Sequence, residues 1–280
     1  MYTFDTPSPI QLTVSNHAGR VSVEAADVTE STVQLTAIDA DAEQAIAEAV
    51  VEHRHEHLVV HLPRGRSGLF RNRAPKVAVD VRVPTDSTVR AKLHSASLST
   101  TGAFSDLNVE LGSGNAVVDT VTGSARINSG SGDLQLRQCD GDLTATLGSG
   151  DIHVDTVLGR VQTRSGSGDV TIGHAGGAVT AGSGSGDIMV GTSESGIAAK
   201  TGSGDVRVTD AQSGEVKAST ASGDVAVGIA QGTAVWLDLN TISGSVRNDL
   251  DAIAQPEETE RKLTLRVKTA SGDISVARAS

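Results

Sequence analysis

The sequence predicts an all-β protein: a flattened single-stranded β-solenoid (β-helix) of about nine 18-residue coils, with an N-terminal β-rich cap that contains one short helix. Three observations predict this fold. The tripeptide Ser-Gly-Asp recurs at intervals of 18 residues, apolar and variable residues alternate after each copy, and a second glycine follows about nine residues later. A repeat of this length is typical of architectures in which each unit packs only on its neighbours.

Each predicted coil holds two short strands. After the turn aspartate the chain reads apolar, variable, apolar, as in Ile152-His153-Val154, and this period of two is the pattern of a half-buried strand. The other half of a coil has a large and then usually a small inward residue, for example Val179 and Ala181. Strands this close leave no room for rings, which explains why a chain of 280 residues has only 1 Trp, 1 Tyr and 3 Phe.

The turns predict how the coils stack. No helix fits between such short strands, so each strand pairs in parallel with its equivalent in the next coil, about 4.8 Å away. Glycine allows a positive φ at the turn, and the neighbouring Asp or Ser can bond nearby backbone N–H groups. The turn aspartates are therefore predicted to form a structural column, made of Asp133, Asp151, Asp169, Asp187, Asp205 and Asp224.

The flanks depart from the 18-residue unit. Residues 1–101 lack it and are predicted to be a β-rich capping region, with one helix near residues 41–52 that is rich in alanine and has acids in its first turn. The solenoid repeat region is predicted over residues 102–280, with a polar insertion at 248–261. Two closing strands after this insertion are expected to complete the last coil.

Composition and charge exclude several classes of protein. The chain has 23 Lys and Arg against 34 Asp and Glu, a net charge of −11, which argues against a nucleic-acid partner. A single cysteine excludes an intramolecular disulfide framework, and no apolar run is long enough to span a membrane. No signal peptide is visible, so a cytoplasmic location is predicted. No nucleophile elbow, P-loop or zinc-protease motif is present, and we expect no cofactor.

The aspartate column has two interpretations. Its carboxylates accept hydrogen bonds from turn N–H and Ser O–H groups, or they bind a row of cations such as Ca²⁺. The first is favoured, because one aspartate per coil supplies fewer oxygens than calcium requires.

Two further groups are candidate sites. His55, His57 and His61 lie at strand-like spacing and are candidate zinc or copper ligands, although a solvated outer face is favoured. The loop that carries Arg64, Arg66, Arg71 and Arg73 is basic. It can contact an anionic lipid surface or an acidic partner, and a solvated loop is the favoured alternative.

Several of these features resemble a known family. Ser-Gly-Asp-Val-x-Val units, an N-terminal strand region and the Trp236–Leu239 segment followed by Ser243-Gly244 resemble a bacterial putative-adhesin family of β-strand-repeat proteins. That family is related to toastrack-like domains of envelope-stress systems and is a domain of unknown function. The resemblance covers nearly the whole chain and implies no catalytic residues.

The predicted function is that of a non-enzymatic structural or protein-interaction β-solenoid that binds a protein partner or itself; self-association and a link to bacterial envelope stress are the two roles left open. Two alternatives stay open: an adhesin-like surface protein and a carbohydrate-active β-helix enzyme. The enzyme is disfavoured because such β-helices have larger coils, clustered carboxylates and aromatic platforms for sugars.

Overall fold

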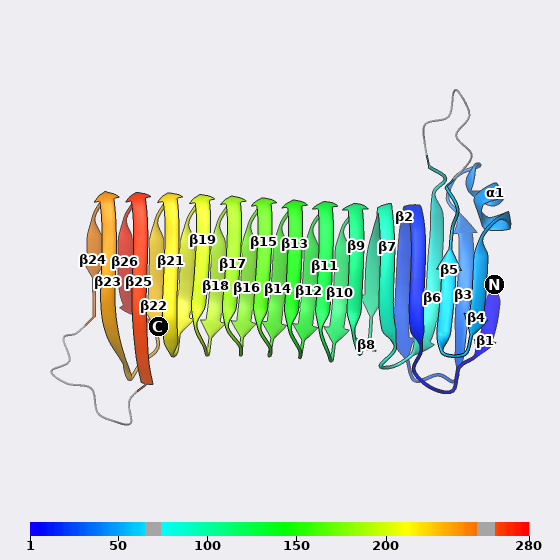
Figure 1. Ribbon diagram of the computed structural model, residues 1–280, viewed down its shortest axis with the longest axis horizontal. Helices are drawn as coiled ribbons and strands as arrows, with labels where there is room; N and C mark the ends of the chain where they lie inside the picture. The colour runs from blue at the N-terminus through cyan, green and yellow to red at the C-terminus, as the bar shows by residue number, and fades with distance from the viewer. Residues whose placement is uncertain (65–73, 251–260, 280) are drawn as a thin grey trace. The chain divides into compact units, whose positions relative to one another are not determined.

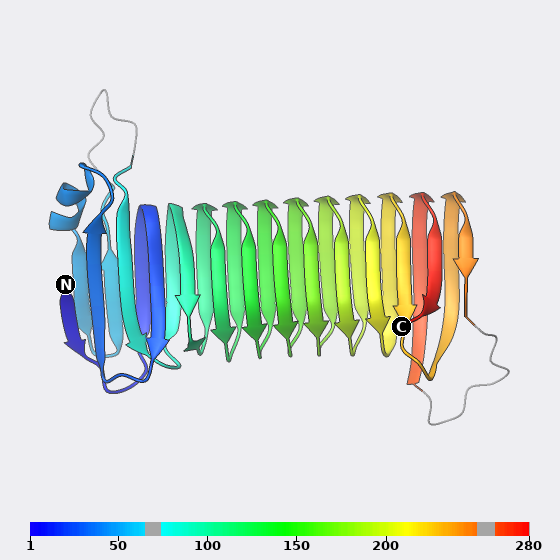
Figure 2. The same ribbon diagram turned by 180° about the vertical axis from the view of Figure 1, so that it is seen from behind.

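The computed structural model describes residues 1–64, 74–250 and 261–279, and the chain divides into two compact units, Met1–Gly141 and Asp142–Ser280. The predicted all-β solenoid is confirmed: within each unit, short strands stack in parallel, coil upon coil (Figure 1). Figure 2 shows the opposite face of the same coils, formed by their second strands. The predicted boundary between a cap and a repeat region at 101/102 stays a prediction.

Unit 2 contains the most regular coils. Val161 pairs with Val179, and Val179 pairs with Ile197, so the 18-residue sequence period is also the strand register. The inward Val, Ile, Leu and Ala residues form a thin buried core, as the lack of rings predicts. The strands are β13 (Leu143–Ser149), β14 (Ile152–Val157), β15 (Val161–Ser167), β16 (Val170–Ala175), β17 (Val179–Ser185), β18 (Ile188–Ser193), β19 (Ile197–Ser203), β20 (Val206–Ala211), β21 (Gly214–Ser222) and β22 (Val225–Ile229).

The last coils of unit 2 do not follow chain order. Strand β25 (Arg261–Ser271) lies between β21 and β23 (Thr233–Ser243), and β26 (Ile274–Arg278) lies between β22 and β24 (Val246–Asn248). The expectation that the closing strands form the last coil is therefore wrong. Leu265 and Ile274 are fully buried in this inserted coil, whereas the equivalent Val246 in the outer coil is 47% exposed. Burying the more apolar coil inside explains the order.

Unit 1 also places an early strand out of chain order. The long β2 (Gln11–Ala26) lies between β7 (Thr88–Thr101) on one side and β5 (His57–His61) and β6 (Val77–Pro84) on the other. Val89 of β7 pairs with Leu107, so the 18-residue register starts before residue 102. The strands that follow are β8 (Ala103–Phe104), β9 (Leu107–Ser113), β10 (Ala116–Val121), β11 (Ala125–Ser131) and β12 (Leu134–Cys139).

The start of unit 1 is covered by antiparallel strands. These are β1 (Tyr2–Asp5), β3 (Glu30–Ala37) and β4 (Val50–Arg54), of which β3 pairs with β6 and β4 with β5. The predicted helix is present as α1 (Ala42–Ala47) but is shorter than expected, since the β-branched Val50 and Val51 pair with β5 instead. In the described part of the chain, no helix has the length and apolar character to cross a membrane.

Two features recur at the turns of unit 2 that follow the first strand of a coil. Gly204 has a φ of 138°, and a Cβ there would lie 2.3 Å from the carbonyl oxygen of Gly186 in the preceding coil, so only glycine fits. A buried hydroxyl holds the turn at Gly186 from inside the solenoid, because Thr201 Oγ1 donates to the Gly186 carbonyl oxygen at 2.9 Å. Ser183 makes the equivalent bond to Gly168 one coil earlier, also at 2.9 Å.

Candidate functional site

The aspartate column stands along the turns that follow the first strand of each coil. In unit 2 each carboxylate accepts the backbone N–H of the aspartate in the next coil: Oδ1 of Asp151 accepts from Asp169 at 2.9 Å, and Oδ1 of Asp169 accepts from Asp187 at 2.8 Å. The ladder continues through Asp205 and Asp224. It then follows the inserted coil through Asp273 to Ser245. In unit 1 the N–H of Asp133 donates to Oδ1 of Asn115 at 3.1 Å.

This ladder has a direct electrostatic consequence. Each N–H donor points the positive end of its dipole at a carboxylate oxygen and so offsets repulsion between neighbouring aspartates. At the outer end, the Ser245 backbone N–H lowers the pKa of Asp273. Among the described residues no group of three or more His, Cys, Asp or Glu side chains is placed to hold a metal ion. The cation interpretation of the column stays a hypothesis.

The structure separates the three candidate histidines. His55 lies in the turn before β5 with a φ of 56°, while His57 and His61 occupy the two ends of β5 with exposed side chains. His61 instead neighbours a pair that the sequence analysis missed: the rings of His17 and His94 have centroids 4.5 Å apart. No local pattern shows this pair, because it depends on the register between β2 and β7.

This histidine cluster, His17, His61 and His94, also includes Arg64. Nη2 of Arg64 lies 3.0 Å from Nε2 of His94. Partial burial lowers the pKa of His17, and the positive charges of His94, Arg64 and His61 lower it further. Within this cluster, His17 therefore resists protonation. Of the four arginines predicted to form a basic loop, the other three, Arg66, Arg71 and Arg73, lie outside the described residues.

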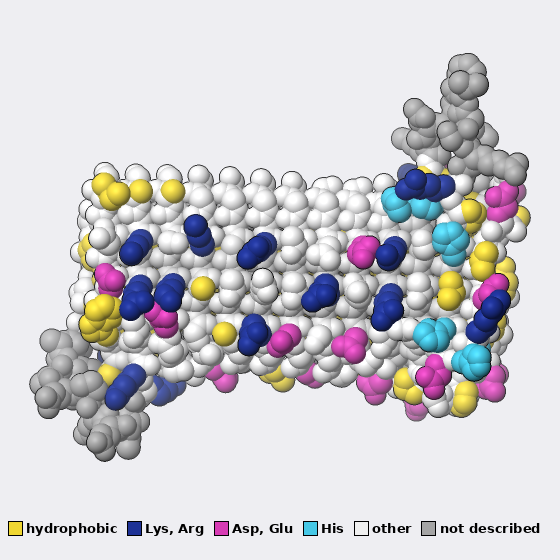
Figure 3. All heavy atoms as spheres, in the orientation of Figure 1, with side chains coloured by type: hydrophobic (Ala, Val, Ile, Leu, Met, Phe, Trp, Pro, Cys, Tyr) yellow, Lys and Arg dark blue, Asp and Glu magenta, His cyan; other side chains and the backbone are white. Residues whose placement is uncertain are grey.

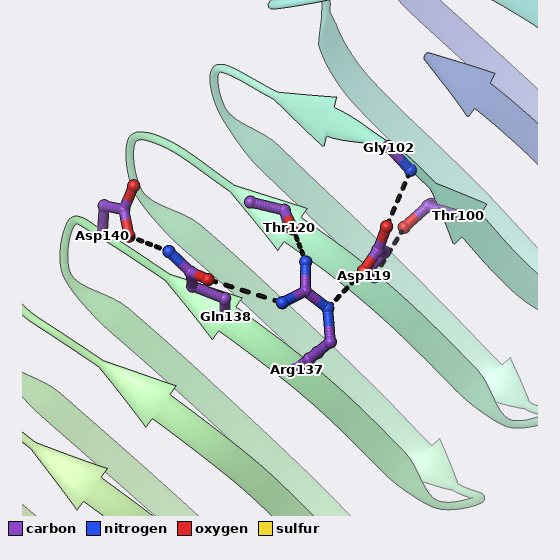
Figure 4. A network of polar contacts seen from close by, with 7 residues as sticks. All are labelled: Thr100, Gly102, Asp119, Thr120, Arg137, Gln138 and Asp140. Atoms are coloured by element: carbon purple, nitrogen blue, oxygen red, sulfur yellow. Dashed lines mark hydrogen bonds and ion pairs between the residues drawn. The ribbon is translucent and has the colours of Figure 1, made fainter. Parts of the chain in front are cut away.

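A polar network on the second strands of unit 1 was also missed (Figure 4). Arg137 of β12 donates to Thr120 and, at 2.5 Å, to Oδ1 of Asp119, while the N–H of Gly102 donates to Oδ2 of Asp119 at 2.9 Å. The Arg137 hydrogen bond lowers the pKa of Asp119, and the Gly102 bond adds to this. Both carboxylate oxygens are thus occupied, so the group clamps adjacent coils and is poorly placed to act as a general base. The rest of the network is Thr100, Gln138 and Asp140.

The outer coil of unit 2, β23 and β24, is the least covered part of that unit. Among the described strands, β23 pairs only with β25 and β24 only with β26, so each has one edge without a strand partner. The exposed fractions are 56% for Trp236, 84% for Ile242 and 47% for Val246. Arg266 lies over the Trp236 ring, 5.9 Å from its centroid. We call β23 and β24 together the outer coil.

The composition of the outer coil departs from that of its neighbours. Opposite Ile242 the adjacent coil has Ala270, a small residue. Val246 occupies the same inward column as the buried Ile274 and Val225. The outer coil therefore has two exposed apolar side chains beside its open strand edge. Ile242 is opposite an alanine in the adjacent coil, and Val246 is half-exposed in a column that is buried elsewhere.

Comparison with known proteins gives one family. The family model Toastrack DUF4097 matches residues 6–193 and 179–280. No curated protein matches the chain.

Several solved structures are similar along their length. A putative adhesin from Bacteroides fragilis is 14% identical, with 99% of this chain and 96% of that chain covered and a TM-score of 0.46. A putative adhesin from Parabacteroides distasonis is 12% identical, with 98% and 95% covered and a TM-score of 0.37. One from Parabacteroides merdae is 10% identical, with 99% and 96% covered and a TM-score of 0.36.

Proposed function

Since this chain belongs to the Toastrack DUF4097 family, whose model matches nearly its whole length, we propose that it is a non-enzymatic β-solenoid that acts through protein interaction. The interaction that the geometry supports best is self-association, in which the outer coil pairs with the outer coil of a second copy. The single observation that carries this proposal is the open edge of β23 and β24 with Ile242 and Val246 exposed beside it.

An open strand edge favours a strand as its occupant. The unpaired N–H and C=O groups of such an edge form hydrogen bonds readily with another extended chain. A second copy offers the same edge, and a two-fold axis normal to the sheets would pair β23 with β23 and β24 with β24, both antiparallel. An isologous contact of this kind closes at a dimer and places like apolar residues together.

Concentration-dependent light scattering tests the proposal. We expect a dimer at high micromolar concentration that dissociates on dilution, and we expect Val246→Lys to give a monomer at every concentration. Met189→Lys is the control for the added charge, because Met189 is an apolar residue of similar exposure, 45% against 47%, at an outward position on an inner coil. Since Val246 lies in the inward column, the melting temperature of each variant reports whether the coils still fold. A wild-type chain that is monomeric at all concentrations, or a dimer that Val246→Lys leaves intact, overturns self-association through this coil.

The non-enzymatic part of the proposal has its own support. A hollow of about 680 Å³ on unit 2 is lined by Gly, Ala, Ser, Thr, Lys and Arg and by no carboxylate or histidine. A hydrolase of the β-helix type needs paired carboxylates at its cleft. The adhesin-like and carbohydrate-active alternatives stay hypotheses, and the cytoplasmic location stays a prediction that cell fractionation tests.

A further inference from the structure

A row of cations crosses the face of unit 2 formed by the first strands of its coils. In register along this row stand Arg164, Gly182, Lys200, Ser219 and Lys268. A cation thus recurs at every second coil, about 10 Å apart given the spacing of paired strands. Figure 3 shows Lys and Arg side chains spread over this face, with Asp and Glu fewer among them. We call Arg164, Lys200 and Lys268 the cation row.

The cation row has no counter-ions of its own. Lys217 and Arg266, in the adjacent row, share Glu215, at 2.7 Å and 2.8 Å respectively. The three side chains of the cation row form no ion pair or hydrogen bond with the described part of the chain. On a protein of net charge −11, this leaves a positive strip without internal neutralisation.

A hollow lies within the cation row. Its volume is about 680 Å³, its floor consists of small residues such as Ala198 and Thr180, and Arg164, Lys200 and Lys217 are its cations. The hollow exists partly because Gly182 has no side chain between Arg164 and Lys200. This glycine is not required by the backbone, since a Cβ there would meet nothing closer than the Lys200 carbonyl oxygen at 3.8 Å.

Other strand glycines of this unit are different. A Cβ on Gly184 would lie 2.4 Å from the carbonyl oxygen of Gly166, so Gly184 is needed for close approach of the coils. Close packing of the coils therefore does not require glycine at position 182. The residue leaves the hollow open between Arg164 and Lys200. An aromatic ring, Trp236, lies on the same face in the outer coil beside Arg266.

We propose that this face of unit 2 binds a linear acidic polysaccharide, whose carboxylate or sulfate groups contact the cation row while its sugar rings lie over the small-residue floor. Charge complementarity selects an anion, and the open, shallow floor accepts a polymer that continues at both ends. The exposed Trp236 ring offers a stacking surface for a sugar at one end. This surface is a sheet face and not a strand edge, so the inference goes beyond the proposed self-association.

Two other polyanions fit the face less well. An acidic peptide gains little, because a sheet face has no free backbone groups for strand addition and the hollow is too open and shallow to enclose an anchoring side chain. Single-stranded nucleic acid depends on stacking of successive bases on aromatic side chains, and the described part of this face offers one such ring, Trp236, which is out of register with the cation row. Tighter binding of either of these polyanions than of the acidic polysaccharide would be an outcome against the proposal.

Titration calorimetry with alginate, a linear polymer of uronic acids, tests the inference. We expect saturable binding that weakens with added salt, no binding of neutral dextran, and weaker binding of poly-L-glutamate of equal charge density. Lys200→Ser should weaken the affinity for alginate by about two- to fivefold, the worth of one exposed ion pair. The control Arg207→Ser removes the same charge from the opposite face and should leave the affinity unchanged.

Gly182 supplies the sharper variant. Gly182→Glu places a negative charge in the hollow and should reduce alginate affinity by about tenfold or more. Gly182→Ala should fold and bind like the wild type, and the melting temperature of each variant reports its folding. The proposal is overturned if Lys200→Ser and Arg207→Ser lose equal affinity for alginate, or if Gly182→Glu binds alginate as the wild type does. It is also overturned if dextran binds as tightly as alginate, or if poly-L-glutamate binds more tightly.

Discussion

The backbone N–H of Asp205 donates to Oδ1 of Asp187 in the preceding coil at 2.8 Å. The relationship joins two copies of the same residue, and it repeats from coil to coil within unit 2. The aspartate side chain, which the sequence predicts to stabilise its own turn, therefore also holds the turn of the next coil by a hydrogen bond. The column stabilises the stack as well as its individual turns, and this leads to the first prediction.

Asp187→Asn should leave the stability of the protein nearly unchanged, whereas Asp187→Ala should lower it by about 1 kcal/mol. Asparagine keeps the Oδ1 acceptor and removes a charge from a crowded column, and Asn115 already plays this part toward Asp133. Alanine leaves the Asp205 N–H to water. Urea unfolding measures both variants, and an equal loss for Asn and Ala would contradict the role given to the acceptor oxygen.

The turn glycines predict a second contrast. Gly204→Ala should destabilise unit 2 by about 2 kcal/mol or more, because its φ of 138° and the Gly186 carbonyl oxygen at 2.3 Å leave no place for a methyl group. Gly182→Ala is the matched control and should be tolerated. Thermal unfolding of the two variants is the measurement. Similar melting temperatures would show that the backbone around Gly204 shifts to accommodate a methyl group, against the prediction.

Acid should destabilise unit 1 through the histidine cluster. The pKa of His17 in the folded protein lies below the unfolded value of 6.5, so the unfolded chain binds more protons as the pH falls. Stability is therefore retained above pH 6.5 and decreases as the pH falls below that value toward the lowered pKa of His17. The groups that face His17 are His94, Arg64 and His61.

Melting temperatures at about pH 7.5 and about pH 5.5 measure this effect. His17→Gln should reduce the drop between them, while His153→Gln, which removes a histidine from unit 2, should not. A drop of the same size in wild type and His17→Gln would assign the pH dependence to other groups.

Metal removal tests the alternative interpretation of the aspartate column. Because Oδ1 of each aspartate from Asp151 to Asp224 already accepts a backbone N–H, we expect the same melting temperature in EDTA and in excess Ca²⁺. Mg²⁺ at the same ionic strength controls for screening. A rise specific to Ca²⁺ would favour the row of cations.

The sequence period was sufficient to predict the coils, their parallel pairing and the inward residues. Val161, Val179 and Ile197 are in register because each repeat must bury the same column of apolar residues. The period could not predict between which strands β2 and β25 lie, since every coil has the same apolar pattern and can pair with any other coil. Which coils become neighbours depends on the total apolar area that the fold buries. The period missed the contact of His17 with His94 for the same reason, as that contact follows from a register across 77 residues.

Hydrogen exchange at the backbone amides of β23, measured at low and at high protein concentration, tests the central claim most directly. If the outer coil pairs with a second copy, amides within Val235–Thr241 that face the open edge will exchange rapidly in dilute solution and slowly in concentrated solution. Amides of β21, which lies between two other coils, will be protected equally at both concentrations. Exchange in β23 that does not depend on concentration would contradict self-association through the outer coil.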